Sequence, residues 1–225
     1  MLRRLAALLL LLVLGVVAGC GEERVGEGHA KLWVTRDRGA QVLLTADVPA
    51  GISAMEALRR EADVETRYGG RYVQAVNGVE GSLGARHDWF YYVNGYEADV
   101  GAADYTVHDG DVIWFDYRGW AGQMRVPVVV GAFPEPFVHG YGGKRREVVV
   151  RPAVDPLATR VAKLVGGRVG PAPRGANVLV LVDGAGMRGW LSGSAGDPVT
   201  FYVGREAARR LLREPSFVRF RYALP

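Results

Sequence analysis

Few side chains in this sequence have the types and spacing that catalysis or metal binding requires. Asp109 and Asp111 flank Gly110 in an expected turn, but two carboxylates are too few for a calcium site. The histidines show no spacing typical of metal ligands; they are His29, His87, His108 and His139. The sequence therefore predicts no metal site.

Two further motifs fall short of cofactor binding or catalysis. Residues 184–189 match G-x-G-x-x-G directly after the strand-like run NVLVLVD, where a dinucleotide fingerprint would begin. The following WLSGSAGDP is full of helix breakers, so no helix N-terminus is expected to receive a pyrophosphate. Ser192 and Ser194 lack the spacing and the preceding strand of a nucleophile elbow. We expect a glycine-rich loop, no catalytic residue and a protein that is not an enzyme.

The most distinctive stretch is HDWFYYVNGYEADV, residues 87–100, in which four aromatic residues precede Asn-Gly. Side chains alternate along a strand, so Trp89 and Tyr91 point to one face while Phe90 and Tyr92 point to the other. One pair can pack under a helix. The other pair either stays exposed, where it could stack on a flat ligand or form the centre of a protein interface, or is buried as well. Both alternatives are compatible with the sequence.

The segment around this run reads as a small sheet with one helix. KLWVTRD and QVLLTADVP form an expected hairpin, and Ser53 can cap a helix that ends near Asp63. Three or four strands follow, separated by Asn-Gly or Asp-Gly pairs that favour tight type I′ turns; these are residues 77–78, 94–95 and 109–110. We predict an α+β protein whose residues 31–120 form a β-grasp-like domain, a mixed sheet covered by one helix.

The same residues carry a family resemblance. YVQAVNGVEG, WFYYVNGYEADVG and DYTVHDGDVIWFDYR resemble a bacterial domain family related to the C-terminal domain of transcobalamin and intrinsic factor, which is common on surface lipoproteins. In the vitamin-binding relatives this domain closes over one side of a corrinoid. The resemblance covers residues 31–120 and implies cobalamin as a candidate ligand. The residues expected to contact a ligand are Trp89, Tyr91, Asn94, Tyr96 and Trp120.

The second half, residues 121–225, alternates expected strands and helices. The strand-like runs are RVPVVVGAF, REVVVRP, NVLVLVDG, PVTFYVG and SFVRFRYAL. Asp155-Pro156 begins a helix that ends at Gly166-Gly167, and a second helix spans about 205–213. This pattern predicts a small basic α/β domain, with no family resemblance.

The first residues read as a targeting segment. Arg3 and Arg4 precede an apolar run that is shorter than the ~20 residues needed to cross a bilayer, which is typical of a secretory signal. Residues 17–20, VAGC, resemble the bacterial lipobox, in which the cysteine is lipidated and the leader is cut before it. The resemblance implies a signal peptide at 1–19, a flexible tether at 20–30 and an extracytoplasmic protein that is lipid-anchored to the bacterial cell membrane through Cys20. An uncleaved anchor, or an ordinary signal with a chance cysteine, would also place the rest outside the cytoplasm.

Charge separates the two halves. Residues 31–120 hold nine basic and fourteen acidic side chains, a net charge of −5, whereas residues 121–225 hold sixteen and seven, a net charge of +9. The basic half is either a solvated surface or a site for anionic lipid or wall polymer, and nucleic acid is not an expected partner of an exported protein. The predicted function is a lipoprotein that binds a small planar ligand; the alternative is a protein-interaction or scaffold lipoprotein without a small-molecule ligand.

Overall fold

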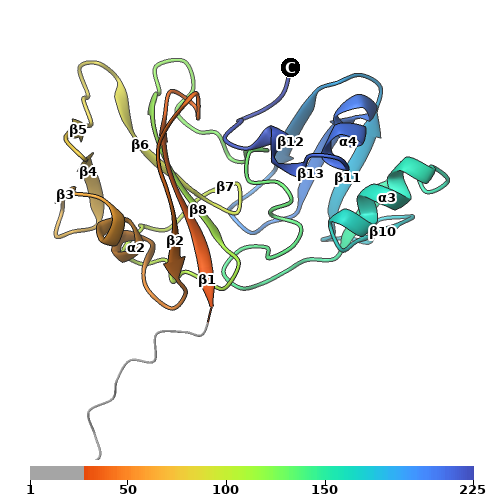
Figure 1. Ribbon diagram of the computed structural model, residues 1–225, viewed down its shortest axis with the longest axis horizontal. Helices are drawn as coiled ribbons and strands as arrows, with labels where there is room; N and C mark the ends of the chain where they lie inside the picture. The colour runs from red at the N-terminus through yellow and green to blue at the C-terminus, as the bar shows by residue number, and fades with distance from the viewer. Residues whose placement is uncertain (1–27) are drawn as a thin grey trace, which may run out of the picture.

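The computed structural model describes residues 28–225, and the fold is α+β, as the sequence predicts (Figure 1). The predicted lipidation site at Cys20, the signal peptide and most of the tether lie outside the described residues. The first half contains β1 (His29–Arg36), β2 (Gln41–Pro49), α2 (Ala54–Glu61), β3 (Val64–Arg67), β4 (Tyr72–Val76), β5 (Val79–Glu80), β6 (His87–Val93), β7 (Tyr96–Glu97) and β8 (Val112–Gly119). The second half contains β9 (Val148–Arg151), α3 (Pro156–Leu164), β10 (Arg168–Val169), β11 (Asn177–Val182), β12 (Met187–Leu191), β13 (Val199–Gly204), α4 (Arg205–Leu211) and the 3₁₀ turn η1 (Pro215–Val218).

The first sheet has the strand order β2-β1-β8-β6-β7. β1 and β8 are parallel at its centre, and the outer pairs are antiparallel, so the sheet is mixed as expected for a β-grasp-like unit. Helix α2 packs its apolar residues on one face; the helix begins where Ser53 Oγ accepts a hydrogen bond from the Glu56 amide at 3.0 Å. A separate small sheet, β3-β4-β5, lies beyond α2 (Figure 1).

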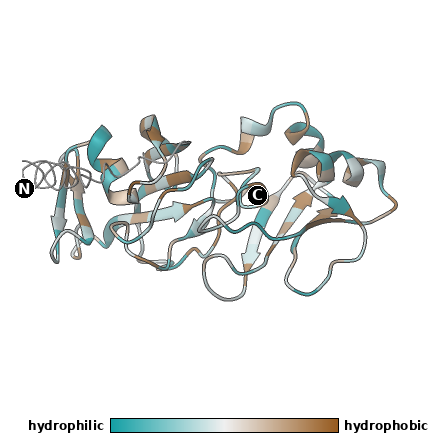
Figure 2. Ribbon diagram, turned by 90° about the horizontal axis from the view of Figure 1, so that it is seen from below, coloured by the Kyte–Doolittle hydropathy of each residue, from teal (hydrophilic) through white to brown (hydrophobic). Residues whose placement is uncertain are grey.

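The second sheet has the order β10-β9-β11-β13-β12 and is parallel except for β12. α3 and α4 share one hydrophobic core with this sheet. In Figure 2 both helices lie on one side of the strands. Asp155 caps α3, its Oδ1 accepting from the Leu157 amide at 2.8 Å, so the Asp-Pro start signal is confirmed.

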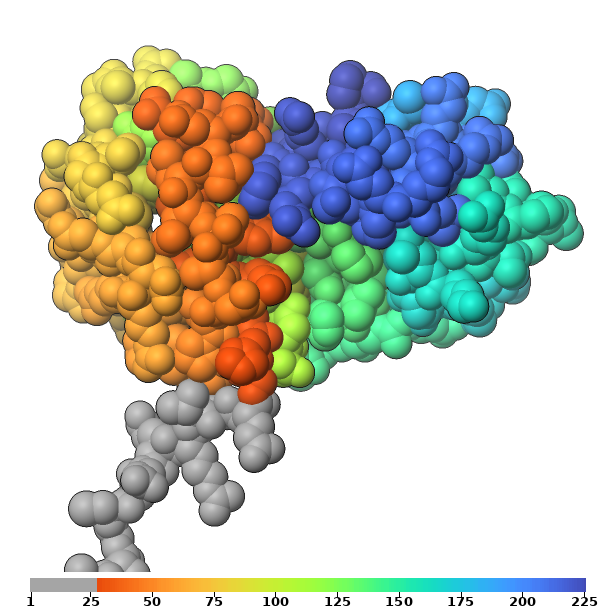
Figure 3. Space-filling model, in the orientation of Figure 1, coloured from red at the N-terminus to blue at the C-terminus, as the bar shows by residue number. Residues whose placement is uncertain are grey.

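Two segments hold the sheets side by side. Residues 126–137 contribute buried side chains to both the second core and the outer face of the first sheet. The C-terminal segment crosses back, placing Phe220 against Trp33 with ring centroids 4.9 Å apart. Figure 3 shows this blue C-terminal segment against the orange β1–β2 hairpin. The halves are therefore joined by packing as well as by the chain.

Four local predictions are wrong. The expected glycine-rich loop at 184–189 runs into strand β12, so a strand directly precedes Ser192. RVPVVVGAF forms turns with one isolated bridge, Tyr96 to Val128, and SFVRFRYAL forms η1 and an irregular tail; neither is a strand. Their alternating apolar residues mimic a strand, but here they fill the junction between the sheets. At 109–110 φ is positive only at Gly110, so this turn is not type I′, whereas residues 77–78 and 94–95 are positive at both positions.

No helix among residues 28–225 is long and apolar enough to cross a membrane.

Candidate functional site

The aromatic run forms most of β6, and its side chains alternate as predicted. Trp89 and Tyr91 belong to the core beneath α2, while Phe90 and Tyr92 belong to the opposite face. That opposite face is covered by residues 126–132 and by the C-terminal tail. Most of the run is therefore core, and only parts of three rings remain accessible: Phe90, Tyr91 and, from the next segment, Trp120.

A cleft of ≈ 400 Å³ lies beside the outer edge of β6, and we call it the aromatic cleft. It exists because β7 pairs only with Tyr92 and Val93, which leaves the preceding residues of β6 at the margin of the sheet. Three of the predicted ligand-contacting residues meet there. The lining consists of Tyr72, Leu83, Asp88, Trp89, Phe90, Tyr91, Glu97, Ala98, Trp120 and Met124.

The floor of the aromatic cleft is rigidly held. Trp89 is only 7 % exposed, and its Nε1 donates to the Val79 carbonyl at 2.9 Å. Tyr91 stacks on Phe115 with a centroid distance of 5.3 Å, and its hydroxyl donates to the Val100 carbonyl. Burial raises the pKa of Tyr91, so the phenol stays protonated. Tyr91 thus offers a fixed, partly accessible ring, whereas the buried Trp89 supports the floor of the cleft.

The wall of the cleft depends on Arg118. Its guanidinium lies 3.6 Å from the centroid of the Phe90 ring, a cation–π contact. The same guanidinium donates to the carbonyls of Gln123 at 2.9 Å and Met124 at 2.8 Å. Because Arg118 is fully buried, it fixes the loop that carries Trp120 and Met124 over the cleft.

Asp88 and Tyr72 form the polar side of the cleft. The Tyr72 hydroxyl donates to Asp88 Oδ2, and Asp88 Oδ1 accepts from the Trp89 amide at 2.8 Å. Burial, followed by the Asp88 hydrogen bond, raises the pKa of Tyr72. This pair keeps a carboxylate at the rim whose two oxygens are already hydrogen-bonded.

Asn94 and Tyr96, also predicted to contact a ligand, lie elsewhere. Asn94 is 0 % exposed; its Nδ2 donates to Asp111 Oδ1 at 2.7 Å and to the Gly140 carbonyl at 2.9 Å, and its Oδ1 accepts from the Val112 amide at 2.7 Å. The buried Tyr96 donates its hydroxyl to the Asp197 carbonyl in the second half, at 2.9 Å. Their polar atoms join the two halves, so we leave both residues out of the ligand surface.

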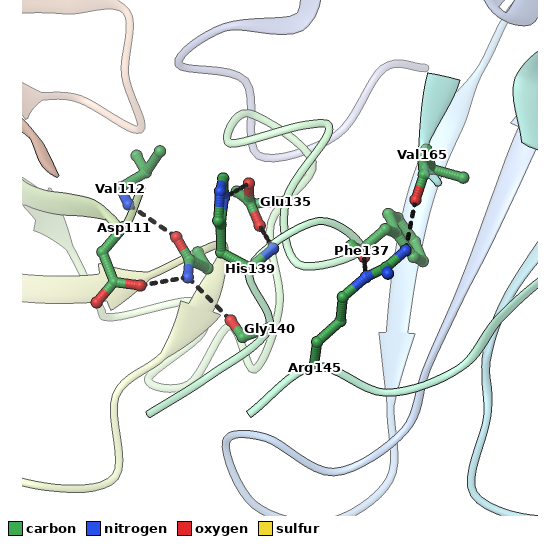
Figure 4. A network of polar contacts seen from close by, with 9 residues as sticks. Asp111, Val112, Glu135, Phe137, His139, Gly140, Arg145 and Val165 are labelled. Atoms are coloured by element: carbon green, nitrogen blue, oxygen red, sulfur yellow. Dashed lines mark hydrogen bonds and ion pairs between the residues drawn. The ribbon is translucent and has the colours of Figure 1, made fainter. Parts of the chain in front are cut away.

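A polar network that no sequence motif indicates lies at the junction between the two halves (Figure 4). Glu135 is buried and accepts from the backbone amide of His139 at 2.8 Å, and the His139 ring nitrogen Nδ1 lies 2.6 Å from Glu135 Oε1. Burial raises the pKa of Glu135, and the His139 contacts oppose that rise. Glu135 and His139 are four residues apart in an irregular loop, a spacing without diagnostic value outside a helix.

The basic run at 143–146 is engaged with the backbone. Arg145 Nε donates to the Phe137 carbonyl at 2.9 Å, and its NH2 group donates to the Val165 carbonyl at 3.2 Å (Figure 4). Arg146 Nε donates to the Gly196 carbonyl at 2.6 Å. These two arginines therefore mainly stabilise the protein itself, by hydrogen bonds to backbone carbonyls of other segments.

The aromatic cleft can stack on an apolar group and partly enclose it, with the hydrogen-bonded Tyr72 and Asp88 at its polar side. Among residues 28–225, no group of three or more His, Cys, Asp or Glu side chains is arranged to hold a metal ion.

The comparisons with known proteins cover the first half of the chain and assign no function to it. Residues 51–119 match the family described as "Domain of unknown function (DUF4430)", which covers less than a third of the chain. A search of curated proteins found no match.

Two solved structures are similar to part of the chain. A candidate metal-binding protein from Ruminococcus gnavus has 19 % identity and a TM-score of 0.35, over 41 % of this chain and 98 % of that protein. Haptocorrin in complex with Cbi has 16 % identity and a TM-score of 0.34, over 41 % of this chain and 25 % of haptocorrin. At such low TM-scores neither similarity indicates what this chain binds.

Proposed function

We propose that this protein is a binding module without catalytic activity, and that its ligand surface is the aromatic cleft. The observation that carries this proposal is the meeting of Trp89, Tyr91 and Trp120 around one hollow of ≈ 400 Å³. That volume falls within the ~300–1,000 Å³ of small-molecule sites, which are concave, mostly apolar and largely pre-formed.

The ligand class that fits is a planar, largely apolar molecule. Tyr91 is held by stacking on Phe115 and by the hydrogen bond of its hydroxyl, so the accessible part of its ring is presented without an entropic cost of ordering. Trp89 is almost fully buried and contributes mainly to the rigidity of the cleft. Trp120 and Met124 are more exposed and form the loop side of the cleft, where a ligand can contact them. A corrinoid is the finer form of this proposal and is supported by the family resemblance of residues 31–120. It is larger than the cleft, so only part of one face would be covered.

The test is a titration of the full chain with cyanocobalamin and, separately, with riboflavin, followed by tryptophan fluorescence. Trp120→Ala should weaken binding about tenfold or more, because one stacking surface is lost. Trp120→Phe should retain most of the affinity. Trp190→Ala, which removes an exposed indole outside the cleft, is the matched control and should bind like the wild type.

Failure of both ligands to bind at ~1 mM, in the range of the weakest specific complexes, would remove the small-molecule proposal. Equal weakening in Trp120→Ala and Trp190→Ala would also remove it, because the loss would then not depend on the cleft.

The alternative, a protein-interaction or scaffold role, is favoured by a different observation. Tyr68 is 80 % exposed and Leu83 is 81 % exposed, beside a second hollow of ≈ 390 Å³ that shares Tyr72, Leu83 and Asp88 with the aromatic cleft. Exposed apolar side chains around a rigid aromatic floor are typical of protein contact surfaces. A protein partner would be sensitive to Tyr68→Asp, whereas a planar ligand in the aromatic cleft, which Tyr68 does not line, should bind this variant like the wild type.

We also propose that the protein is exported and lipid-anchored through Cys20. The support is the sequence VAGC after a basic, apolar leader. Metabolic labelling with palmitate should mark the wild type and not Cys20→Ala. Equal labelling of both proteins would show that the lipobox assignment is wrong.

A further inference from the structure

Strand β12 is the outermost strand of the second sheet, and its outer edge is only partly paired. Met187 and Leu224 exchange two backbone hydrogen bonds across this edge, Met187 N to Leu224 O at 3.1 Å and Leu224 N to Met187 O at 2.8 Å. Leu224 therefore pairs with β12 at the position where a sixth, antiparallel strand of the sheet would lie.

The remainder of that edge is directed outward. In an antiparallel pair, alternate residues point their backbone groups to opposite sides of the strand. Met187 points outward, so Gly189 and Leu191, which have the same phase, do so too. Neither makes a backbone hydrogen bond across this edge to any residue within 28–225. Two amides and two carbonyls are thus available in a row.

A groove of ≈ 450 Å³, which we call the edge groove, runs along these free groups. Its far wall is formed by residues 126–128 and by Tyr222. Before Leu224 the C-terminal segment turns away from the edge of β12, because the Tyr222 hydroxyl donates to the buried Asp116 Oδ2 at 2.8 Å. The described part of the chain therefore does not occupy the sixth-strand position opposite Gly189 and Leu191.

Arginines and aromatic rings border the edge groove. The guanidinium of Arg38 lies 5.4 Å from the centroid of the Tyr222 ring, which lines the groove. Arg188 also lines the groove, and its guanidinium lies 5.4 Å from the ring of Tyr202 on β13, outside the groove. Neither guanidinium forms an ion pair with a residue of the described part of the chain. Trp190 is 57 % exposed beside them. Trp, Tyr and Arg are the residues that dominate binding energy at protein interfaces.

We propose that the edge groove binds an extended acidic peptide segment of a partner protein, which adds to β12 as an antiparallel strand. The free backbone groups of Gly189 and Leu191 match such a strand, and about three peptide residues at ~3.4 Å each cover them. Acidic side chains of the peptide pair with Arg38 and Arg188. A small anion would meet the arginines but would leave the backbone edge unpaired, so a peptide satisfies more of the site.

The test uses the isotope-labelled full chain and the blocked peptide acetyl-Glu-Val-Thr-Val-Glu-amide. We expect the peptide to slow amide hydrogen exchange at Gly189 and Leu191 and to shift their amide resonances. Replacing both peptide glutamates by lysine, or methylating its three central amide nitrogens, should each weaken binding at least about tenfold.

Protein variants separate the charge contribution. Arg188→Glu should weaken the peptide at least about tenfold, the loss expected for a charge-assisted hydrogen bond. Arg209→Glu, an equal charge change at an exposed position on α4, is the matched control and should bind as the wild type does.

Three results would overturn the proposal. The first is no protection of Gly189 and Leu191 at ~1 mM peptide, and the second is equal binding of the N-methylated peptide, which would indicate an anion site only. The third is protection that appears without peptide and grows with protein concentration, because a second copy of the chain would then be the occupant.

Discussion

Alanine substitution at two equivalent glycines tests how the first sheet is joined to the second. Gly78 and Gly95 are each the second residue of an Asn-Gly turn, with φ of +77° and +84°. A Cβ at Gly78 would meet no atom within 4 Å, whereas a Cβ at Gly95 would lie 2.8 Å from the Val129 carbonyl oxygen. The Val129 amide in turn donates to the Gly95 carbonyl at 2.8 Å, so this backbone contact cannot open without losing a hydrogen bond.

The two variants should therefore differ. Gly78→Ala bears only the left-handed backbone cost of about 1–2 kcal/mol. Gly95→Ala bears the same cost and, in addition, an overpacking cost of about 1–3 kcal/mol. The assay is equilibrium unfolding of the full chain in urea, with circular dichroism, for both variants and the wild type. Equal losses in the free energy of unfolding at the two glycines would refute the close packing of the 94–95 turn against residues 128–132.

Three other outcomes are expected. Asn94→Ala should lower the free energy of unfolding by about 3–5 kcal/mol, because it strands buried partners of three hydrogen bonds, whereas Asn77→Ala in the exposed turn should cost far less; similar losses in urea unfolding would contradict the network. Burial raises the pKa of Asp116, so the folded state binds the carboxyl proton more tightly than the unfolded state does. This proton therefore stabilises the folded protein fully below the ordinary pKa of about 4, and the stabilisation is lost as pH rises through the raised pKa. In urea unfolding at a series of acidic pH values, Asp116→Asn should reduce the loss of unfolding free energy with rising pH. An unchanged dependence on pH would contradict this prediction. The +9 half should bind anionic vesicles in a salt-sensitive way, and equal binding to neutral vesicles in a sedimentation assay would exclude electrostatic attraction of this half to anionic lipid.

Local signals in the sequence determined the elements that depend on neighbouring residues. Ser53 and Asp155 cap helices because a short side-chain oxygen satisfies free amides of the first turn. The Asn-Gly pairs at 77–78 and 94–95 form turns with two positive φ values, since both residue types tolerate that region. The period of two along β6 likewise assigned Trp89 and Tyr91 to one face.

Tertiary structure alone decided what those faces meet. The run RVPVVVGAF, residues 125–133, favours a strand because apolar residues recur there, yet its side chains fill the junction between two sheets that are distant in sequence. The C-terminal tail was also predicted to be a strand, but Tyr222 leaves the edge of β12 to reach Asp116, which lies 106 residues earlier. Packing outweighs strand propensity at these positions, because propensity is worth little compared with burial of an aromatic ring.

The same long-range contacts divided the predicted ligand residues. Trp89, Tyr91 and Trp120 line one cleft because Arg118 fixes the loop after β8 against Phe90. Asn94 and Tyr96 follow them closely in sequence but turn into the junction, where partners from residues 140 and 197 satisfy their polar groups. Sequence determines which side chains share a strand face, whereas the burial of each depends on segments that no local pattern specifies.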